Sequence, residues 1–295
     1  MKVVGIGGGH GLAATLRAAR EYADDIAAVV TVADDGGSSG RLTRELGIPP
    51  PGDIRNCLVA LAGDTELGEL YQHRFVGGLL TGHTLGNLVI AALAETTHDF
   101  AAAVARAGEL LKCEGHVYPA TTHLVELGAH VEGGEIEGQV AVAQTKTRIE
   151  SVFLAPADPP PCVGAVNAIR AADQIVLGPG SLYTSLIATL LVPGIGSAVR
   201  HSKAHKIFVC NGRPQKGETE DLDATAHLRA LIRHGGEGIA DTMVVQRPEL
   251  EDDGVEVDIA ELEALGVTVV EADVVRPDGG HDPGPLAGVL STLSR

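Results

Sequence analysis

Short apolar runs alternate with longer amphipathic segments along this chain. Residues 2–6 and the continuous apolar run 26–32 predict two strands, the second buried on both faces. Between them, residues 12–22 carry Leu16 and Ala19 at helical spacing behind a glycine-rich loop. Strand, loop, helix and strand in this order form a right-handed βαβ unit, which predicts a parallel sheet.

The same alternation continues further along the chain. Strands are expected at residues 174–177, 206–210, 242–246 and 267–270. Helices are expected at residues 54–62 with Asp53 as the N-cap, after the stretch TGHTLGN, and at residues 100–112, 165–172, from 182 and around 227–234. Residues 33–56 are rich in Gly, Ser and Pro, which predicts an irregular segment.

Residues 117–154 break this rhythm. They contain short alternating stretches separated by Gly-Gly, a pattern typical of hairpins, and so predict a small β-rich insertion. Large α/β sheets commonly form one unit even when they exceed the usual domain length. The prediction is therefore a single domain over residues 1–295: an α/β, Rossmann-like, doubly wound and mostly parallel sheet with a β-rich insertion at 117–154.

Composition and charge limit the kinds of partner that this chain can bind. The chain is 44% hydrophobic but only 3% aromatic, so its core must be built from Ala, Val, Leu and Ile. A net charge of −17 repels nucleic acids and anionic membranes, which argues against nucleic-acid partners. Any anionic ligand must therefore be held by backbone dipoles or by a few arginines.

Cysteine usage and hydropathy indicate a cytoplasmic protein. The four cysteines lie far apart without a C-x-x-C pair, which favours buried free thiols in a reducing compartment. No signal-peptide pattern opens the chain, and Pro193 interrupts the apolar stretch 184–199 before it reaches the length of a membrane span. We expect no membrane insertion.

The first glycine loop predicts a close backbone approach to a ligand. It follows the first strand, where a helix N-terminus would direct free amides at an oxygen of a phosphate or sugar. The loop does not match the dinucleotide pattern G-x-G-x-x-G, because His10 or Leu12 stands where a glycine is needed. A tight turn without a ligand is the alternative. The candidate contacts in this loop are Gly7, Gly8, Gly9, His10 and Gly11.

Two acids follow the second strand. Asp34 and Asp35 stand where a carboxylate would meet a ribose hydroxyl, and as a pair they are candidate Mg²⁺ ligands. The alternative is that they only cap the next turn. The residues that follow favour a binding role and are further candidates: Gly36, Gly37, Ser38 and Ser39.

A second glycine loop, GPGSLYTS at 178–185, repeats the arrangement of strand, turn and helix. It lacks the G-x-S-x-G pattern of a nucleophile elbow, so Ser181 is interpreted as an anion or sugar contact. Other polar residues are expected at the same rim, where Arg55 could equally form a surface ion pair and Asn87 a helix cap. The remaining candidate contacts are Gly178, Gly180, Ser181, Leu182, Arg55, Asn56, Asn87 and Asn211. No catalytic set is evident.

Taken together, the stretches GGGHGLAATLR, TVADDGGSSGRL, PPGDIRN, GHTLGNLVIAAL, LGPGSLYTSLIATLLVPGI and FVCNGRPQKGET resemble the YvcK family, also called gluconeogenesis factors. The resemblance covers about the whole chain, and the family's fold is similar to that of the 2-phospho-lactate transferases. Two features depart from the family pattern. His10 replaces the threonine of GGGTG, and Gly280 stands where an arginine often precedes His-Asp.

The resemblance implies binding of UDP-N-acetylglucosamine and control of carbon flow into cell-wall precursors, with roles in gluconeogenic growth and cell shape. It implies a homodimer, a regulated enzyme of amino-sugar synthesis as partner, and no required cofactor, although Mg²⁺ could accompany the nucleotide. No reaction is established for the family. An Mg²⁺-dependent phospho-transferase similar to the 2-phospho-lactate transferases is the alternative, whereas NAD-dependent redox chemistry is disfavoured by the failed fingerprint.

Overall fold

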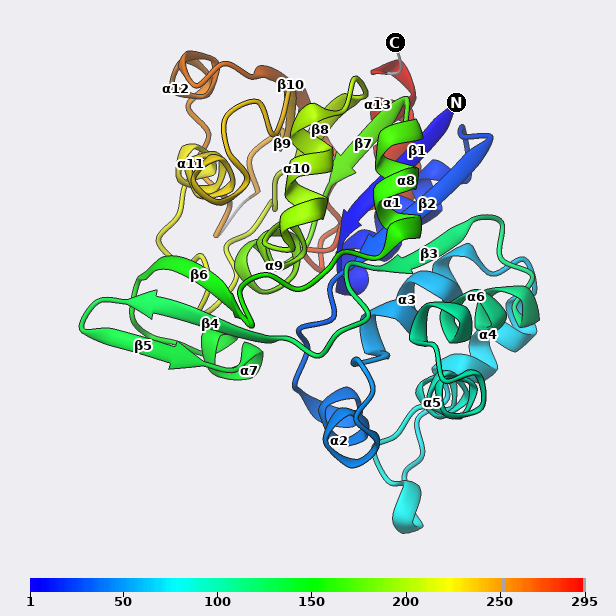
Figure 1. The fold of residues 1–295 in the computed structure, drawn as a ribbon. Helices are drawn as coiled ribbons and strands as arrows, with labels where there is room; N and C mark the ends of the chain where they lie inside the picture. The colour runs from blue at the N-terminus through cyan, green and yellow to red at the C-terminus, as the bar shows by residue number, and fades with distance from the viewer. Residues whose placement is uncertain (251–252, 294–295) are drawn as a thin grey trace.

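A seven-stranded parallel sheet forms the centre of the computed structural model, which describes residues 1–250 and 253–293 (Figure 1). Across the sheet the order is β3-β2-β1-β7-β8-β9-β10, and every neighbouring pair is parallel. Counted along the chain, this is the Rossmann order with one further strand at the edge. The strands are β1 (Lys2–Gly7), β2 (Asp25–Val30), β3 (His116–Pro119), β7 (Gln174–Leu177), β8 (His205–Val209), β9 (Thr242–Gln246) and β10 (Thr268–Ala272).

Helices cover both faces of this sheet because the strands are apolar on both sides. In β1, Val4 and Ile6 belong to one hydrophobic core and Val3 to the other. The helices are α1 (Gly9–Ala19), α2 (Gly37–Leu46), α3 (Gly52–Leu61), α4 (Thr65–Gln72), α5 (Leu85–Thr97), α6 (Phe100–Leu110), α7 (Gln139–Ala143), α8 (Val163–Ala171), α9 (Ala188–Leu190), α10 (Pro193–His201), α11 (Ala224–Gly235), α12 (Ile259–Ala264) and α13 (Pro283–Thr292), with the 3-10 turn η1 (Gly78–Leu80) and the π-helical turn η2 (Leu182–Ile187).

The β-rich segment is a three-stranded antiparallel sheet that lies beside the main sheet (Figure 1). Its strands are β4 (Glu126–Val131), β5 (Gly134–Glu137) and β6 (Ile149–Ala155). Residues 117–119, at the start of the predicted insertion, instead form part of β3 and pair with β2 in the main sheet.

Two expectations for residues 33–56 were wrong. The segment is not irregular throughout, because α2 forms there, with Leu42 buried and Gly47 ending the helix at a φ of 67°. Asp53 is not the N-cap of α3: that position is Pro51, and Asp53 lies within the first turn. The carboxyl of Asp53 therefore does not act as the cap of α3.

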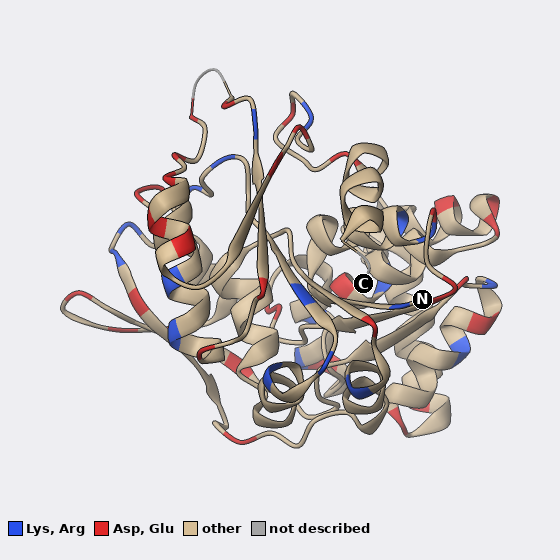
Figure 2. Cartoon of the chain, turned by 90° about the horizontal axis from the view of Figure 1, so that it is seen from above, with Lys and Arg blue, Asp and Glu red and all other residues tan. Residues whose placement is uncertain are grey.

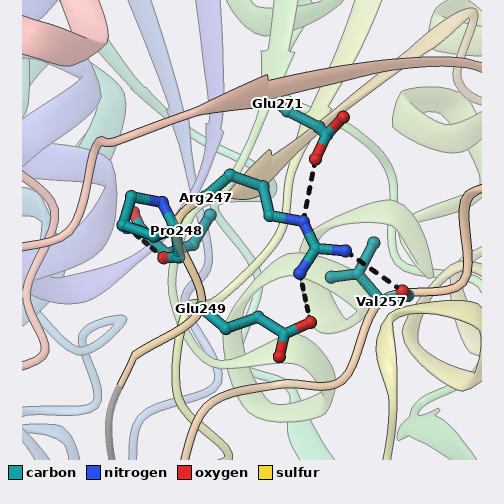
Figure 3. A network of polar contacts seen from close by, with 6 residues as sticks. Arg247, Pro248, Glu249, Val257 and Glu271 are labelled. Atoms are coloured by element: carbon teal, nitrogen blue, oxygen red, sulfur yellow. Dashed lines mark hydrogen bonds and ion pairs between the residues drawn. The ribbon is translucent and has the colours of Figure 1, made fainter.

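Arg247 lies away from the carboxyl ends of β1 and β7 and forms polar contacts with the edge strand of the main sheet and with the segment after β9 (Figure 3). Its Nε donates to Glu271 of β10 at 2.8 Å, and its Nη2 donates to the Val257 carbonyl at 3.3 Å. Its Nη1 pairs with Glu249. The contacts with Glu249 and then Glu271 raise the pKa of Arg247, and together the three contacts hold the segment after β9 against the edge strand.

Within the described residues, no single helix is long and apolar enough to cross a membrane. One bent helix pair, Leu182–Leu190 with Pro193–His201 at 80°, meets the length and composition test.

Candidate ligand-binding cleft

The cleft lies where the strand order reverses. Strands β1 and β7 are neighbours, and the chain leaves them for opposite faces of the sheet. Helix α1 packs against α3 and α13, with Leu12 in one core, whereas Ile187 of η2 belongs to the other core. The two connections therefore separate at the carboxyl ends of the strands and leave a crevice between them.

The two glycine loops approach each other too closely for side chains. A Cβ atom on Gly11 would lie 2.3 Å from the Pro179 carbonyl oxygen. Thr15 Oγ1 donates to the Gly178 carbonyl at 2.7 Å and joins α1 to the second loop. Gly11 is thus required by packing between the loops, whatever ligand the cleft takes.

Both loops line a cleft of about 320 Å³. Helix α1 enters it at its N-terminus, where the N-cap Gly8 has no side chain to cap the helix and the first amides lack partners within the helix. The Gly9 amide donates to the Asp53 carboxyl instead. The lining residues are Gly8, Gly9, His10, Gly11, Thr31, Asp34, Asp53, Gln139, Gly180, Ser181, Thr184, Ser185 and Gln215. The cleft is therefore polar and has an open helix N-terminus in its wall.

Two carboxyl groups face this cleft, from Asp34 after β2 and Asp53 in α3. Burial raises the pKa of Asp34, although the Gly36 amide donates to its Oδ1 at 3.0 Å. Burial, and then the nearby Asp34, raise the pKa of Asp53 to about 7. Two acids held this way resist carrying two negative charges unless a cation is present.

Asp35 is directed away from the cleft. Its Oδ1 accepts a hydrogen bond from the Val140 amide at 2.9 Å. This bond links the loop after β2 to α7, the helix between β5 and β6. In this cleft the carboxyl that accompanies Asp34 is that of Asp53, whereas Asp34 and Asp35 together line a separate pocket of about 400 Å³. The pairing of Asp34 with Asp35 as metal ligands stays a prediction. The described residues hold no cluster of three or more His, Cys, Asp or Glu side chains suited to a metal.

A second, basic hollow of about 430 Å³ adjoins the cleft and shares His10, Gly11, Gly180 and Gln215 with it. Three arginines from separate segments line it: Arg17, Arg213 and Arg276. Burial and then the neighbouring Arg276 lower the pKa of Arg17. Arg276 also forms an ion pair at 3.1 Å with Asp278, which lines the same hollow. A Cβ atom on Gly280 would lie 2.6 Å from Arg276 Nη2, so Arg276 takes the space beside Gly280.

Most hydrogen-bonding groups of the second glycine loop have partners within the protein itself. Glu218 is buried and accepts hydrogen bonds from the Tyr183 and Thr184 amides at 3.0 and 3.3 Å. It also accepts from the Thr184 hydroxyl at 2.5 Å. Asn211 donates to the Gly180 carbonyl at 2.8 Å and accepts from the Gly180 amide at 3.1 Å. The amides of Gly180, Tyr183 and Thr184 therefore already have acceptors within the protein and are not free for a phosphate.

Several predicted contacts lie outside both hollows, in a buried polar cluster among α2, α3 and α5. Arg55 donates to the Thr84 hydroxyl and to Asn56 Oδ1, each at 2.6 Å. Asn87 donates to Ser38 Oγ at 3.1 Å. Neither the surface ion pair nor the helix cap considered for these residues is observed. The predicted contacts that line neither hollow are Gly7, Asp35, Gly36, Gly37, Ser38, Ser39, Arg55, Asn56, Asn87, Gly178 and Leu182.

Some lining residues were missed by sequence reasoning. Arg17 follows His10 by seven residues and Ala14 by three, a helical spacing that would have placed all three on one side of α1. Gln139 comes from the small sheet's helix α7, and Arg276 from a loop after β10. No sequence pattern connects these last two to the glycine loops.

Comparison with known proteins agrees with the fold and the family resemblance. The family model described as 2-phospho-L-lactate transferase CofD matches residues 3–275. The gluconeogenesis factor of Bacillus subtilis is 43% identical over 309 residues, covering 99% of this chain and 98% of the relative. That of Halalkalibacterium halodurans is 44% identical over 282 residues, covering 91% and 88%.

A crystal structure of a UPF0052 family protein from Bacillus halodurans matches with a TM-score of 0.95 and 41% identity, covering 98% of each chain. The parallel sheet with its flanking helices is thus common to both proteins. Since the matched relatives and the family model cover nearly all of the sequence, the chain belongs to the CofD family and, within it, to the gluconeogenesis factors.

Proposed function

We propose that this chain binds a nucleotide sugar, UDP-N-acetylglucosamine, in the cleft between β1 and β7. The observation that carries the proposal is the N-terminus of α1, which lies between a hollow lined by arginines and a cleft lined by carboxyls. A diphosphate is attracted by helix amides and guanidinium groups, whereas ribose and sugar hydroxyls donate to carboxylates. One ligand with both kinds of group fits this arrangement.

In this proposal the diphosphate lies over the amides at His10 and Gly11, toward Arg17 and Arg276. These residues border the junction of the two hollows. Because Glu218 already occupies the amides of Tyr183 and Thr184, we do not assign a phosphate to the second loop. Ser181 and Gln215 remain as contacts for neutral groups of the ligand.

The biological role that we propose is a cytoplasmic regulator of carbon flow into cell-wall precursors, needed for gluconeogenic growth and cell shape. The name gluconeogenesis factor, carried by relatives that match along nearly their whole length, supports the link to gluconeogenic growth. Ligand occupancy would report the supply of amino sugars to a regulated enzyme of their synthesis. One serine and histidine pair is brought together, Ser38 Oγ with His83 Nδ1 at 2.9 Å, but both side chains are buried and neither lines the cleft, which favours binding over catalysis there.

Mg²⁺ fits this site as a companion of the ligand. Asp34 and Asp53 would hold it, since two carboxylates with phosphate oxygens and waters satisfy its preference for oxygen ligands. The raised pKa of Asp53 agrees with a carboxyl placed for a cation. The ion would neutralise the carboxyls and the diphosphate together.

An Mg²⁺-dependent transferase of a phosphorus-containing group is the second candidate. It is favoured by the two convergent carboxyls and by the family model, whose description is 2-phospho-L-lactate transferase. Such an enzyme would release a nucleotide product from a nucleoside diphosphate derivative. Chromatography after incubation with UDP-N-acetylglucosamine or GDP derivatives and Mg²⁺ separates the two candidates, because a binding protein leaves the nucleotide unchanged.

The proposal is tested by calorimetry and thermal unfolding with UDP-N-acetylglucosamine, UDP and GDP. Preferential binding to the folded state raises the melting temperature. We expect Arg276→Ala to weaken UDP-N-acetylglucosamine binding by about tenfold, or about 1.4 kcal/mol. Arg170→Ala, which removes an exposed arginine of α8, is the control and should not change affinity. Unchanged melting temperature with every nucleotide sugar at millimolar concentration would rule the proposal out.

A further inference from the structure

The small antiparallel sheet contributes a single residue to the wall of the ligand cleft, Gln139 of α7. Helix α7 packs against β4 and β5 of that sheet and also against the π-helical turn η2. Gln139 lines the cleft together with the carboxyls of Asp34 and Asp53, but it does not line the basic hollow. It therefore belongs to the part of the site that contains carboxyls and not to the part that contains guanidinium groups.

Hydrogen bonds fix the backbone on both sides of Gln139. The Gly138 amide donates to the Leu127 carbonyl of β4 at 2.8 Å. The Val140 amide donates to Asp35 Oδ1 at 2.9 Å. Gly138 has a φ of 94°, which favours glycine, and a Cβ atom there would lie 2.7 Å from Asp35 Oδ2. Position 139 is thus held at the cleft by β4 and by the loop after β2, so a ligand would meet a preorganised side chain.

Two carboxamide side chains line the cleft, and they differ in their hydrogen bonds. Gln215 donates from Nε2 to Ser181 Oγ at 3.1 Å and accepts from Asn211 Nδ2 at 3.3 Å. The side chain of Gln139 is half-buried and forms no hydrogen bond within residues 1–250 and 253–293. Its NH₂ group can donate and its carbonyl oxygen can accept. Of the two carboxamides, Gln139 is therefore the one available to a ligand.

The charge of the protein favours a neutral group at this position. The chain carries 22 basic and 39 acidic side chains, and the acidic ones are spread widely over the molecule (Figure 2). A further carboxylate beside Asp34 and Asp53 would repel an anionic ligand, whereas a carboxamide adds hydrogen bonds without charge. The guanidinium groups of the basic hollow suit the diphosphate and can stack on a nucleobase. Gln139 is therefore suited to a neutral polar group at the other end of the ligand.

We infer that Gln139 recognises the acetamido group of the bound sugar and so determines the specificity of the site. The inference rests on the proposed function, with the nucleobase in the basic hollow and the sugar in the cleft. Sugar hydroxyls donate to the carboxylates, whereas an acetamido group has an N–H donor and a carbonyl acceptor that match the two ends of a carboxamide. A hydroxyl in place of that group has a single oxygen and leaves one end of Gln139 unpaired.

Calorimetric titration of the full chain with UDP-N-acetylglucosamine, UDP-glucose and UDP tests the inference. We expect the wild-type chain to bind the acetylated sugar about tenfold more tightly than UDP-glucose. Gln139→Ala should remove this preference by weakening binding of UDP-N-acetylglucosamine about tenfold, with less than about a twofold change for the other two ligands. Gln144→Ala is the matched control, because Gln144 is exposed directly after α7, and it should keep the preference. Melting temperatures verify that both variants fold.

The three ligands separate failure of this inference from failure of the proposed function. A Gln139→Ala chain that still prefers the acetylated sugar, or a wild-type chain without that preference, would overturn the role of Gln139 and leave nucleotide-sugar binding in place. Equal weakening of all three ligands in Gln139→Ala, UDP included, would also overturn it, because the side chain would then contact the nucleotide. A wild-type chain that binds none of the three would refute the proposed function, and the role of Gln139 with it.

Discussion

The carboxyl of Asp53 lies directly against the backbone of Gly8. A Cβ atom added to Gly8 would lie 2.3 Å from Asp53 Oδ2 and 2.8 Å from Thr31 Cγ2. The Gly9 amide also donates to this carboxyl. The first glycine loop is thus shaped as much by an acid from α3 as by any ligand, which links the position of α3 to the open end of α1.

Gly8→Ala tests this contact. The new methyl group cannot fit without moving the loop or α3, so we expect a loss of about 1–3 kcal/mol in the free energy of unfolding and weaker ligand binding. Urea unfolding gives the first quantity and calorimetry the second. Gly288→Ala is the control, because a Cβ atom there meets nothing within 4 Å in helix α13 and should stabilise slightly. Equal effects of both changes would refute the close contact.

The raised pKa of Asp53 predicts a pH-dependent stability. Its folded value of about 7 exceeds the ordinary 3.8, so between these pH values the folded state keeps a proton that the unfolded chain releases. The free energy of unfolding therefore falls as pH rises from about 4 to 7. Above pH 7 this loss of stability has reached its full size. Asp53→Asn should remove this cost and stabilise the chain at pH 8, by an amount on the order of 1–3 kcal/mol.

Urea unfolding in EDTA at a series of pH values measures the effect without interference from a cation. Asp221→Asn, at an exposed carboxyl, is the control and should follow the wild-type profile. A difference between Asp53→Asn and wild type that does not grow with pH would contradict the assignment.

The sequence predicted the central sheet well because its strands are short, apolar and separated by helices. The strands at 174–177 and 242–246 match β7 and β9 at both ends. Helix α2 was missed because Gly37, Ser38, Ser39 and Gly40 are poor helix formers, and the helix gains its stability from packing of Leu42. Local propensity was overridden by tertiary contact at this position.

The site was predicted less completely than the sheet. The loops of Gly8 and Gly180 face one cleft as expected, since both follow neighbouring strands of the reversed order. The roles of Asp35 and Glu218 were not predictable, because each depends on a segment far away in sequence: Val140 for one, Thr184 for the other. Such long-range contacts decide which polar groups face a ligand and which form hydrogen bonds with another loop.

The contacts of Glu218 predict a large loss of stability on truncation. Glu218→Ala would leave the amides of Tyr183 and Thr184 and the Thr184 hydroxyl without an acceptor in a buried site, at a cost of about 2–4 kcal/mol. Glu218→Gln keeps one carbonyl oxygen and should lose less. Thermal or urea unfolding ranks these variants, with Glu220→Ala, at an exposed position, as the neutral control. A Glu218→Ala chain as stable as the control would show that these hydrogen bonds contribute little.

The different orientations of the two neighbouring acids lead to a prediction about Mg²⁺. If Asp34 and Asp53 hold the ion, Mg²⁺ should strengthen binding of UDP-N-acetylglucosamine, and Asp34→Asn should abolish that gain. Asp35→Asn should retain it, because Asp35 faces the Val140 amide of α7 and not the cleft. Its amide oxygen can still accept from Val140, so folding should be preserved. Titrations with Mg²⁺ and with EDTA provide the comparison, and loss of the Mg²⁺ effect in Asp35→Asn but not in Asp34→Asn would favour the pairing suggested by the sequence.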